Sequence, residues 1–373
     1  MAEMNSPKRM VIVVGARPQF IKAAALHRTL KSAKNWETIW VHTGQHHDEA
    51  LSKQFFKELS LPQPQVTLSP TSSSRELRMG DMMHGVREVI RKAKPDWMLV
   101  FGDTDSTLAG AFAASAEGVP LIHVEAGLRS HLWSMPEEVN RVLTDRLSSI
   151  LICPTDSAVL HLKREGITHV EGDSPHPSRP WVIRTGDIMH DNAIHFGSSW
   201  PEIDRGRGRI LLTLHRPSNV DNPNLLRRWL NSTGAWLEKV GLEATFPVHP
   251  RTANVLENNL PAWRKELRDN SIFTTNPLGY LDLLQAVCQA PLVLTDSGGV
   301  QKEAYSLGTR CVVLRGTTEW VEQVEREQSA LAHGPEDLDK LATTMLNKGR
   351  FKTDDLYGTG QAANDILRCL EKV

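Results

Sequence analysis

The stretch LIHVEAGLRSHLWSMPEEVNR, residues 121–141, predicts a buried strand that leads through a polar loop into a helix. LIHV at its start is typical of a strand buried on both faces, and PEEVNR near its end begins a helical pattern. A strand of this kind followed by a helix indicates a parallel sheet covered by helices. The same stretch gathers three carboxylates and two guanidinium groups where the strand ends, at Glu125, Arg129, Glu137, Glu138 and Arg141.

This alternation of short apolar runs and longer helical patterns recurs along the chain and restarts after residue 186. The polar, glycine-rich segment GSSWPEIDRGRGR is typical of a linker. The sequence therefore predicts an α/β protein with two Rossmann-like, doubly wound domains, residues 1–190 and 205–373, and a cleft between them. The prediction allows the last helix of the chain to pack against the first domain. We expect strands at 10–15, 38–42, 97–102, 121–125, 149–155, 209–215, 243–249, 271–276, 291–299 and 310–316.

Composition excludes several classes of protein. The 43 basic and 44 acidic residues nearly cancel, so we expect no binding to nucleic acid or to a membrane surface. No apolar run approaches the roughly 20 residues of a membrane-spanning helix. The segment MAEMNSPKR at the start lacks the pattern of a signal peptide, and the four cysteines form no CxxC pair. These features predict a cytoplasmic protein.

Polar side chains follow many of the predicted strands. In doubly wound sheets, ligands bind beyond the carboxyl ends of the strands. We therefore expect the side chains at these ends to face one cleft: Arg17, His42, Asp103, Glu125, His215, His249 and the loop 296–299.

The segment LTDSGGVQKEA follows one such strand and begins a helix. Gly298 and Gly299 allow close approach of a ligand to the backbone, Ser297 adds a hydroxyl, and the helix N-terminus favours an anion such as phosphate. Glu303, one turn further on, is suited to binding both hydroxyls of a ribose. The alternative is an ordinary strand-to-helix turn capped by Asp296 or Ser297. Neither GxGxxG nor GxxxxGK[ST] is present, which disfavours dinucleotide cofactors and P-loop hydrolysis.

The segment VVGARPQFIK is a similar strand-to-helix turn in the first domain, and it is also suited to an anion. Gly15 makes the turn, and Pro18 is suited to the first turn of a helix. Arg17 and Lys22 supply positive charge for a diphosphate or a developing anion. The alternative is that both are surface cations near the start of a helix.

The carboxylates at adjacent strand ends are candidates for acid–base chemistry. Asp103 and Glu125 each end a strand, and we expect their mutual repulsion to separate the pKa values within the group. Arg129 and Arg141 would hold the group together or bind phosphate. For Asp103 the alternative is a cap on the next helix.

Glu137 also has a structural interpretation. The segment SMPE fits a capping box with Ser134 as the N-cap and Glu137 three residues later. Glu137 is also spaced four residues from Arg141, as in an ion pair on a helix surface. Either role is compatible with catalysis by Glu137.

Two histidines end strands of the second domain. His215, in TLHRPSN, and His249, in FPVHPRT and close to Arg251, suit phosphate binding or proton transfer. The segment HTGQHHD, 42–48, has potential metal ligands, but no convincing set of ligands accompanies it in the second domain, so we expect no metal.

Taken together, these motifs resemble the non-hydrolysing UDP-N-acetylglucosamine 2-epimerase family. The matching segments are GARPQFIK, HTGQH, GDTDST, HVEAGLRS, PEEVNR, PVHPRT, TDSGGVQKEA and TTEW, which lie in the family's order. The resemblance implies a GT-B fold, a homodimer, and UDP held mainly by the C-terminal domain. It also implies reversible inversion at C2 of a UDP-sugar without NAD or metal, by anti elimination of UDP and re-addition to the opposite face.

The resemblance also assigns roles to individual residues. The family's catalytic carboxylates fall on Asp103, Glu125 and Glu137, and its second-domain histidine falls on His215. Its UDP contacts fall on Arg17, Ser297, Gly298 and Glu303. The remaining residues that we expect to bind the UDP-sugar are Lys22, Gln45, His46, Arg141, His249, Arg251 and Gly299.

Within this family, the chain looks closer to the branch that acts on UDP-2,3-diacetamido-2,3-dideoxy-glucuronic acid, a precursor of bacterial surface polysaccharides. The segments that carry this similarity are MPEEVNRVLTDR, QKEAY and TEW. Three alternatives stay open. A hydrolysing epimerase would release UDP and free sugar, and a GT-B glycosyltransferase would share the UDP site without needing the carboxylates. A UDP-sugar sensor would bind without turnover and gain nothing from repelling charges.

Overall fold

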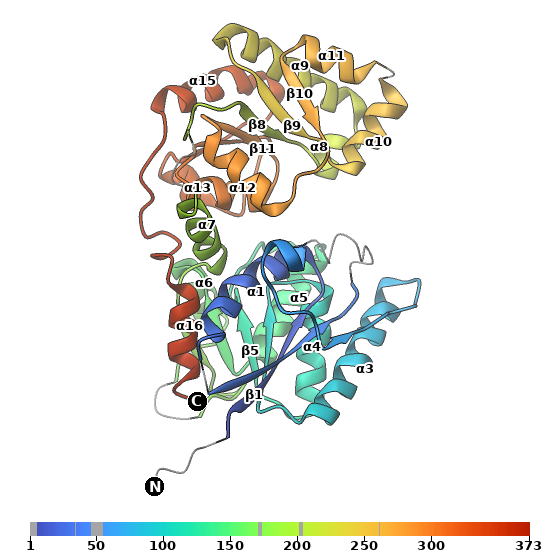
Figure 1. The fold of residues 1–373 in the computed structure, drawn as a ribbon, viewed down its shortest axis with the longest axis vertical. Coiled ribbons are helices and arrows are strands. Elements are labelled where there is room, and N and C mark those ends of the chain that lie inside the picture. The colour runs from blue at the N-terminus through green and yellow to red at the C-terminus, as the bar shows by residue number, and fades with distance from the viewer. Residues whose placement is uncertain (1–5, 34, 46–54, 171–173, 201–203, 261) are drawn as a thin grey trace. The chain divides into compact units, whose positions relative to one another are not determined.

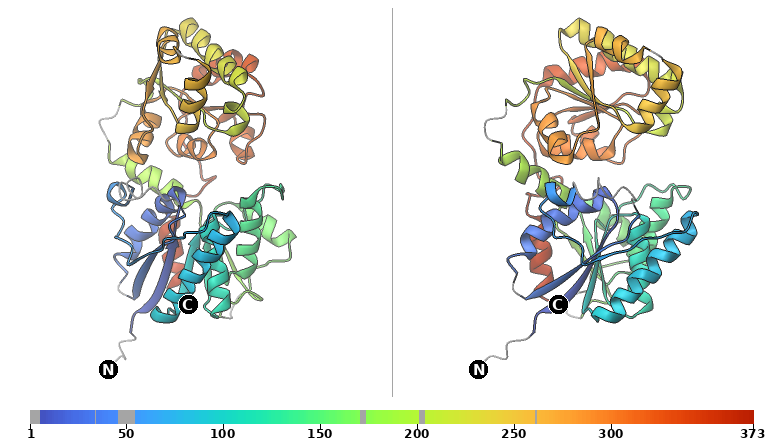
Figure 2. Two further views of the ribbon diagram at one scale, coloured as in Figure 1. Left: turned by 90° about the vertical axis from the view of Figure 1, so that its right-hand side faces the viewer. Right: turned by 45° about the vertical axis from the view of Figure 1, so that its right-hand side comes forward.

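The computed structural model describes residues 6–33, 35–45, 55–170, 174–200, 204–260 and 262–373. The chain forms two compact units (Figure 1). Unit 1 is Met1–Asn192 with Asp355–Val373, and unit 2 is Ala193–Asp354. Each unit contains one parallel sheet with helices on both faces (Figure 2), so the predicted α/β class is confirmed.

Unit 1 has a seven-stranded sheet in the order β3-β2-β1-β4-β5-β6-β7. Its strands are β1 (Lys8–Val14), β2 (Trp36–His42), β3 (Val66–Thr67), β4 (Trp97–Phe101), β5 (Leu121–Val124), β6 (Ile150–Cys153) and β7 (Trp181–Arg184). Its helices are α1 (Arg17–Leu30), α3 (Arg75–Ala93), α4 (Asp105–Ala116), α5 (Pro136–Leu147), α6 (Asp156–Arg164), the start of α7 (Ile188–Ser198) and α16 (Ala362–Leu370).

Unit 2 has a six-stranded sheet in the order β10-β9-β8-β11-β12-β13. Its strands are β8 (Ile210–Thr213), β9 (Ala244–Pro247), β10 (Ile272–Thr275), β11 (Val293–Thr295), β12 (Cys311–Val313) and β13 (Ser329–Leu331). Its helices are α8 (Pro217–Val220), α9 (Pro223–Val240), α10 (Pro250–Asn259), α11 (Trp263–Asp269), α12 (Tyr280–Gln289), α13 (Gly298–Ser306), α14 (Val321–Glu325), the 3-10 helix η1 (Pro335–Asp337) and α15 (Leu338–Lys348).

Central strands form the hydrophobic cores because their residues are apolar in continuous runs rather than in alternation. All five residues of β4 are buried, as are the last five of β1. In unit 2, the first three residues of β8 and all three residues of β11 are buried, and the two strands pair directly. The order of strands reverses between β1 and β4 and between β8 and β11, which are the positions where ligands bind in such sheets.

The C-terminal segment returns to unit 1, although the sequence pattern groups it with the second domain. Helix α16 packs against α1. The Asp191 carboxylate, on α7, accepts hydrogen bonds from the backbone of Ala362 and Ala363 at the start of α16. This contact caps α16 and fixes the end of the chain to unit 1.

Candidate active site

A buried glutamine organises the reversal point of unit 1. Oε1 of Gln19 accepts hydrogen bonds from the backbone N–H groups of Gly15 (2.8 Å) and Ala16 (3.1 Å) after β1. Its Nε2 donates to the carbonyl oxygen of Phe101 (3.1 Å) at the end of β4. One side chain therefore holds together the two loops that leave the sheet in opposite directions.

Gly15 is required at this point by close approach. A Cβ there would lie 2.0 Å from Oγ1 of Thr43 and 2.2 Å from Oγ of Ser106, so any other residue would displace these hydroxyls. Gln45 lies in the same place, where its Oε1 accepts a hydrogen bond from the backbone of Ser106 (2.9 Å). The contact places Gln45 at the start of α4, and its role toward a substrate stays a prediction.

Arg17 is the first residue of α1, and Pro18 lies in the first turn as predicted. The Arg17 guanidinium lies 5.4 Å from the centroid of the Phe55 ring, and it has no ion pair within the part of the chain that the structure describes. A half-buried cation at a helix N-terminus is suited to an anionic ligand.

Glu125, which follows β5, forms an ion pair with Lys22 of α1 at the carboxyl ends of the strands. The two side chains are 10% and 7% exposed, so the ion pair is almost completely buried. Glu125 has φ of 72°, in the left-handed region that non-glycine residues seldom adopt and that clusters at functional sites. A Cβ on Gly102 would lie 2.9 Å from Nζ of Lys22 and 3.1 Å from Oε2 of Glu125. The pair therefore lies against the residue that precedes Asp103.

Asp103 pairs with Arg141 of α5. The cap of α4 is Thr104, whose hydroxyl accepts a hydrogen bond from the backbone of Thr107, so the alternative of Asp103 as a helix cap is wrong. We expected Asp103 and Glu125 to repel each other. In the structure each of these carboxylates instead forms an ion pair with its own cation, Arg141 and Lys22 respectively. Asp103 remains about one-third exposed and accessible to a ligand.

Glu137 and Glu138 differ sharply although they are neighbours. Glu138 is 1% exposed and accepts hydrogen bonds from the backbones of Ser130 (2.9 Å) and His131 (2.8 Å) and from Arg141 (3.2 Å). Burial raises the pKa of the Glu138 carboxyl, but these donors outweigh burial and hold the pKa below its usual value. Glu138 thus anchors the loop before α5.

Glu137 is exposed in the first turn of α5 and makes no hydrogen bond or ion pair with any residue that the structure describes. The N-cap of α5 is Met135, with no side-chain cap, so the predicted capping box at Ser134 is wrong. Arg141 bonds to Glu138 and Asp103, which also replaces the suggested pair with Glu137. Because Arg141 contacts these two carboxylates instead, the Glu137 carboxylate is available to a ligand.

Arg129 has a structural role, contrary to the expectation that it would meet the carboxylates or phosphate. It is 1% exposed and pairs with Asp145 (2.7 Å) and Glu165 (2.6 Å). Asp145 also binds Nδ1 of His123 (2.7 Å), whose Nε2 contacts the carbonyl oxygen of Gly102 (2.7 Å). This buried network supports the turn before Asp103. The polar histidine within LIHV was the signal for it in the sequence.

Asp296 connects the loops after β8 and β11 in unit 2, as Gln19 connects two loops in unit 1. Its fully buried carboxylate accepts hydrogen bonds from the backbones of His215 (3.0 Å) and Arg216 (2.9 Å) and from Asn219 (3.1 Å). Burial raises the pKa of Asp296, but His215 and the other donors outweigh burial and hold the pKa below its usual value. Nδ1 of His215 lies 3.0 Å from Oδ1 of Asp296. The contact orients the ring and leaves Nε2 as its other polar atom.

Helix α13 begins beside Asp296, with Ser297 as its N-cap accepting a hydrogen bond from the backbone of Val300 (3.4 Å). Gly298 and Gly299 form its first turn with ordinary negative φ, so their value lies in the absence of a side chain rather than in backbone freedom. Ser297 therefore caps the helix, as the structural alternative predicted. The binding of an anion at this helix N-terminus stays a prediction.

Glu303 is buried on α13 and only 4% exposed. Burial raises the pKa of its carboxyl to about 8, and the nearby Lys302 offsets only part of that effect. Its Oε2 has no hydrogen-bond partner among the residues described. A buried, unsatisfied carboxyl oxygen is costly, so Glu303 is suited to a ligand that supplies donors, and its contact with a ribose stays a prediction.

His249 and Arg251 lie at the end of β9. The two rings of His215 and His249 are 5.6 Å apart, which brings both predicted histidines together. Nδ1 of His249 accepts a hydrogen bond from the backbone of Arg251, and Arg251 pairs with Asp221 (2.7 Å). The substrate contacts of both residues stay predictions.

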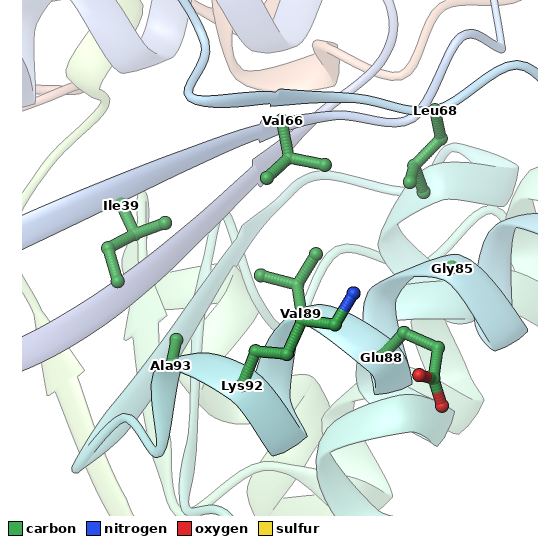
Figure 3. Close-up of a pocket in the computed structure, with 8 residues that line it drawn as sticks. All are labelled: Ile39, Val66, Leu68, Gly85, Glu88, Val89, Lys92 and Ala93. Carbon is green, nitrogen blue, oxygen red and sulfur yellow. The ribbon is translucent and has the colours of Figure 1, made fainter.

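His46 lies outside the described residues. Within the described ranges, no group of three or more histidine, cysteine or acidic side chains is arranged to hold a metal ion, and no helix is long and apolar enough to cross a membrane. An apolar pocket lies between the sheet edge and α3 (Figure 3), and no predicted site residue lines it. Its lining residues are Ile39, Val66, Leu68, Gly85, Glu88, Val89, Lys92 and Ala93.

Two doubly wound units, each with polar groups at the carboxyl ends of its reversal-point strands, define a protein of the GT-B class. The family model described as UDP-N-acetylglucosamine 2-epimerase matches residues 28–371, and the chain belongs to this family. Its named relatives are UDP-sugar 2-epimerases, which are isomerases.

Among these relatives is the UDP-2,3-diacetamido-2,3-dideoxy-D-glucuronate 2-epimerase of Pseudomonas aeruginosa, 39% identical over 98% of this chain and 100% of that protein. The UDP-N-acetylglucosamine 2-epimerase of Methanocaldococcus jannaschii is 38% identical over 97% of this chain and 98% of that protein. A crystal structure of the M. jannaschii enzyme in complex with UDP-GlcNAc and UDP superposes with a TM-score of 0.83, at 35% identity, covering 98% of this chain and 100% of the other.

Proposed function

We propose that this protein reversibly inverts C2 of a UDP-2-acetamido sugar, by anti elimination of UDP and re-addition to the opposite face. The observation that carries the proposal is the set of carboxylates at one edge of the unit 1 sheet in a chain of this family. Asp103 and Glu125 follow adjacent strands, and Glu137 is exposed and makes no hydrogen bond or ion pair with the residues that the structure describes. We assign proton transfer to these three side chains.

The C2 proton of such a sugar is not acidic, so breaking of the C1–O bond has to share the work of removing it. Cations that stabilise the departing UDP lower the barrier to this step. Arg17, at the N-terminus of α1, is suited to that role. Because the proton leaves from one face and returns to the other, the reaction needs more than one acid–base group. Several carboxylates at one sheet edge meet that requirement.

We assign the nucleotide to unit 2. The N-terminus of α13, with Ser297, Gly298 and Gly299, is suited to the diphosphate, and buried Glu303 to the ribose hydroxyls. His215, oriented by Asp296, is suited to proton transfer or to phosphate binding. The M. jannaschii complex with UDP-GlcNAc and UDP, similar over nearly the whole chain, supports a nucleotide-sugar ligand.

Two substrates fit this proposal. They are the pair UDP-GlcNAc and UDP-ManNAc, and the 2,3-diacetamido-glucuronate analogue named for the P. aeruginosa relative. A role in making precursors of surface polysaccharides follows from either. We further propose a homodimer in the cytoplasm, where nucleotide sugars are made; the four cysteines are buried as free thiols, which fits a reducing compartment.

Proton NMR of the purified protein with each substrate in D2O tests the proposal. We expect a second anomeric signal, with deuterium entering at C2 of both epimers. Failure of both substrates to exchange, with UDP bound and the protein folded, would refute the epimerase. Release of free sugar without return to UDP-sugar would instead identify the hydrolysing reaction.

Glu303 should make UDP binding dependent on pH. Ribose hydroxyls donate to an ionised carboxylate, whereas burial keeps Glu303 neutral below its pKa of about 8. UDP binding should therefore release a proton and tighten as pH rises from 7 to 9, with a limiting slope of about tenfold per pH unit below the pKa. Isothermal titration in two buffers of different ionisation enthalpy measures both effects.

In Glu303→Gln, the affinity for UDP should be weaker and almost independent of pH over the same range. Glu325→Gln makes the same substitution at an exposed position of unit 2 and should keep the slope of the wild type. A wild-type slope in Glu303→Gln would show that another group releases the proton.

A further inference from the structure

The segment TTEW, residues 317–320, contains an acidic side chain among cations. Glu319 accepts hydrogen bonds from both terminal nitrogens of Arg315, and its Oε1 lies 3.8 Å from Nη2 of Arg216. Burial raises the pKa of Glu319, but the hydrogen bonds and charge of Arg315, with the charge of Arg216, outweigh burial and hold the pKa below its usual value. Glu319 is therefore a carboxylate at neutral pH.

This carboxylate lies at the N-terminus of α13. A Cβ on Gly298 would lie 3.4 Å from Oε2 of Glu319 and 3.8 Å from Nη2 of Arg216. Two guanidinium groups and a helix N-terminus together favour an anion. The Nε atoms of Arg216 and Arg315 are also buried without a hydrogen-bond partner in the described part of the chain, so both groups have donors in reserve.

The residues on either side of Glu319 are held by hydrogen bonds, whereas the Glu319 side chain is partly exposed. Nε1 of Trp320 donates to the carbonyl oxygen of Gly298 (3.0 Å), and Oγ1 of Thr318 donates to Oε1 of Gln301 (2.6 Å). The Glu319 side chain is 37% exposed. Rotation of this side chain toward solvent, about its own bonds, would release both arginines.

We propose that Glu319 is an internal anion that occupies the phosphate position at the start of α13 and is displaced by the diphosphate of the nucleotide sugar. The inference rests on the proposed function, and it adds a residue that lowers affinity for the ligand rather than raising it. A carboxylate that competes with the ligand for the same arginines lowers the affinity of the site for every diphosphate. It also favours release of the nucleotide, because the arginines regain a partner when the diphosphate leaves.

Isothermal titration of UDP, pyrophosphate and uridine with the wild type and with Glu319→Gln tests this competition. We expect the variant to bind UDP and pyrophosphate about tenfold more tightly, and uridine with unchanged affinity, because only the diphosphate meets the arginines. Glu325→Gln, on the neighbouring helix α14, is the control for a general change in charge and should bind all three ligands as the wild type does.

Each other result overturns the proposal. Weaker binding of UDP and pyrophosphate with unchanged uridine would mean that Glu319 orders the arginines for phosphate. Equal changes for all three ligands, or no change, would mean that it does not compete with the diphosphate. If the folded wild type bound none of the three, the assignment of the nucleotide to unit 2 would fail first, and this proposal with it.

Discussion

Glu137→Gln should lose C2 exchange by about 10²- to 10⁴-fold while the stability of the protein stays almost unchanged. Glu137 is exposed and has no hydrogen bond or ion pair within the described residues, so the amide disturbs no folded contact. The same amide cannot accept or deliver a proton, which is the role proposed for this side chain. Deuterium exchange at C2, with UDP affinity and thermal unfolding on the same samples, measures the three quantities.

Glu138→Gln is the matched control, because it makes the same change one residue away. Its carboxylate is buried and accepts hydrogen bonds from two backbone N–H groups and Arg141. The amide would turn an NH2 group toward these donors, and we expect a loss of about 2–4 kcal/mol in stability. Exchange at the wild-type rate in Glu137→Gln would remove Glu137 from the mechanism. Unchanged stability in Glu138→Gln would contradict its anchoring role.

The central strands of both sheets, and the place of several candidate site residues at strand ends, could be predicted from the sequence. All ten predicted strands form, because central parallel strands are continuous apolar runs. Among the edge strands, β10 was predicted, whereas β3, β7 and β13, which have two to four residues, were not. Gly15, Asp103 and Glu125 lie where the rule for strand ends places them.

The partners of the site residues could not be predicted, because they are distant in the chain. Lys22 and Glu125 are 103 residues apart, and Arg141 and Asp103 are 38 apart. No local pattern specifies which cation meets which carboxylate. The cap at Met135, by contrast, is predictable from a local signal, because proline favours the first position of a helix and α5 begins at Pro136.

Removing either charge of the Lys22–Glu125 pair should destabilise unit 1 by about 3–5 kcal/mol, because the other charge stays buried and loses this ion pair. The two side chains are 7% and 10% exposed, so water cannot replace the lost contact. Lys22→Met and Glu125→Gln keep the approximate volumes. The double variant should be less destabilised than the sum of the two, with a coupling of about 1–3 kcal/mol. Hydrogen exchange of the β4 and β5 amides in urea reports the stability of unit 1 by itself.

The pair of Arg9 and Glu37 on the same sheet is the control for this cycle. Its side chains are 42% and 51% exposed, so solvent screens the pair, and the cycle of Arg9→Met and Glu37→Gln should give a coupling below about 1 kcal/mol. Equal coupling in the two cycles would mean that burial does not strengthen the Lys22–Glu125 pair. A larger coupling at Lys22–Glu125 would show that a buried cation holds the Glu125 carboxylate in place. The fold does so at a residue whose backbone lies in the left-handed region, which disfavours any residue with a side chain.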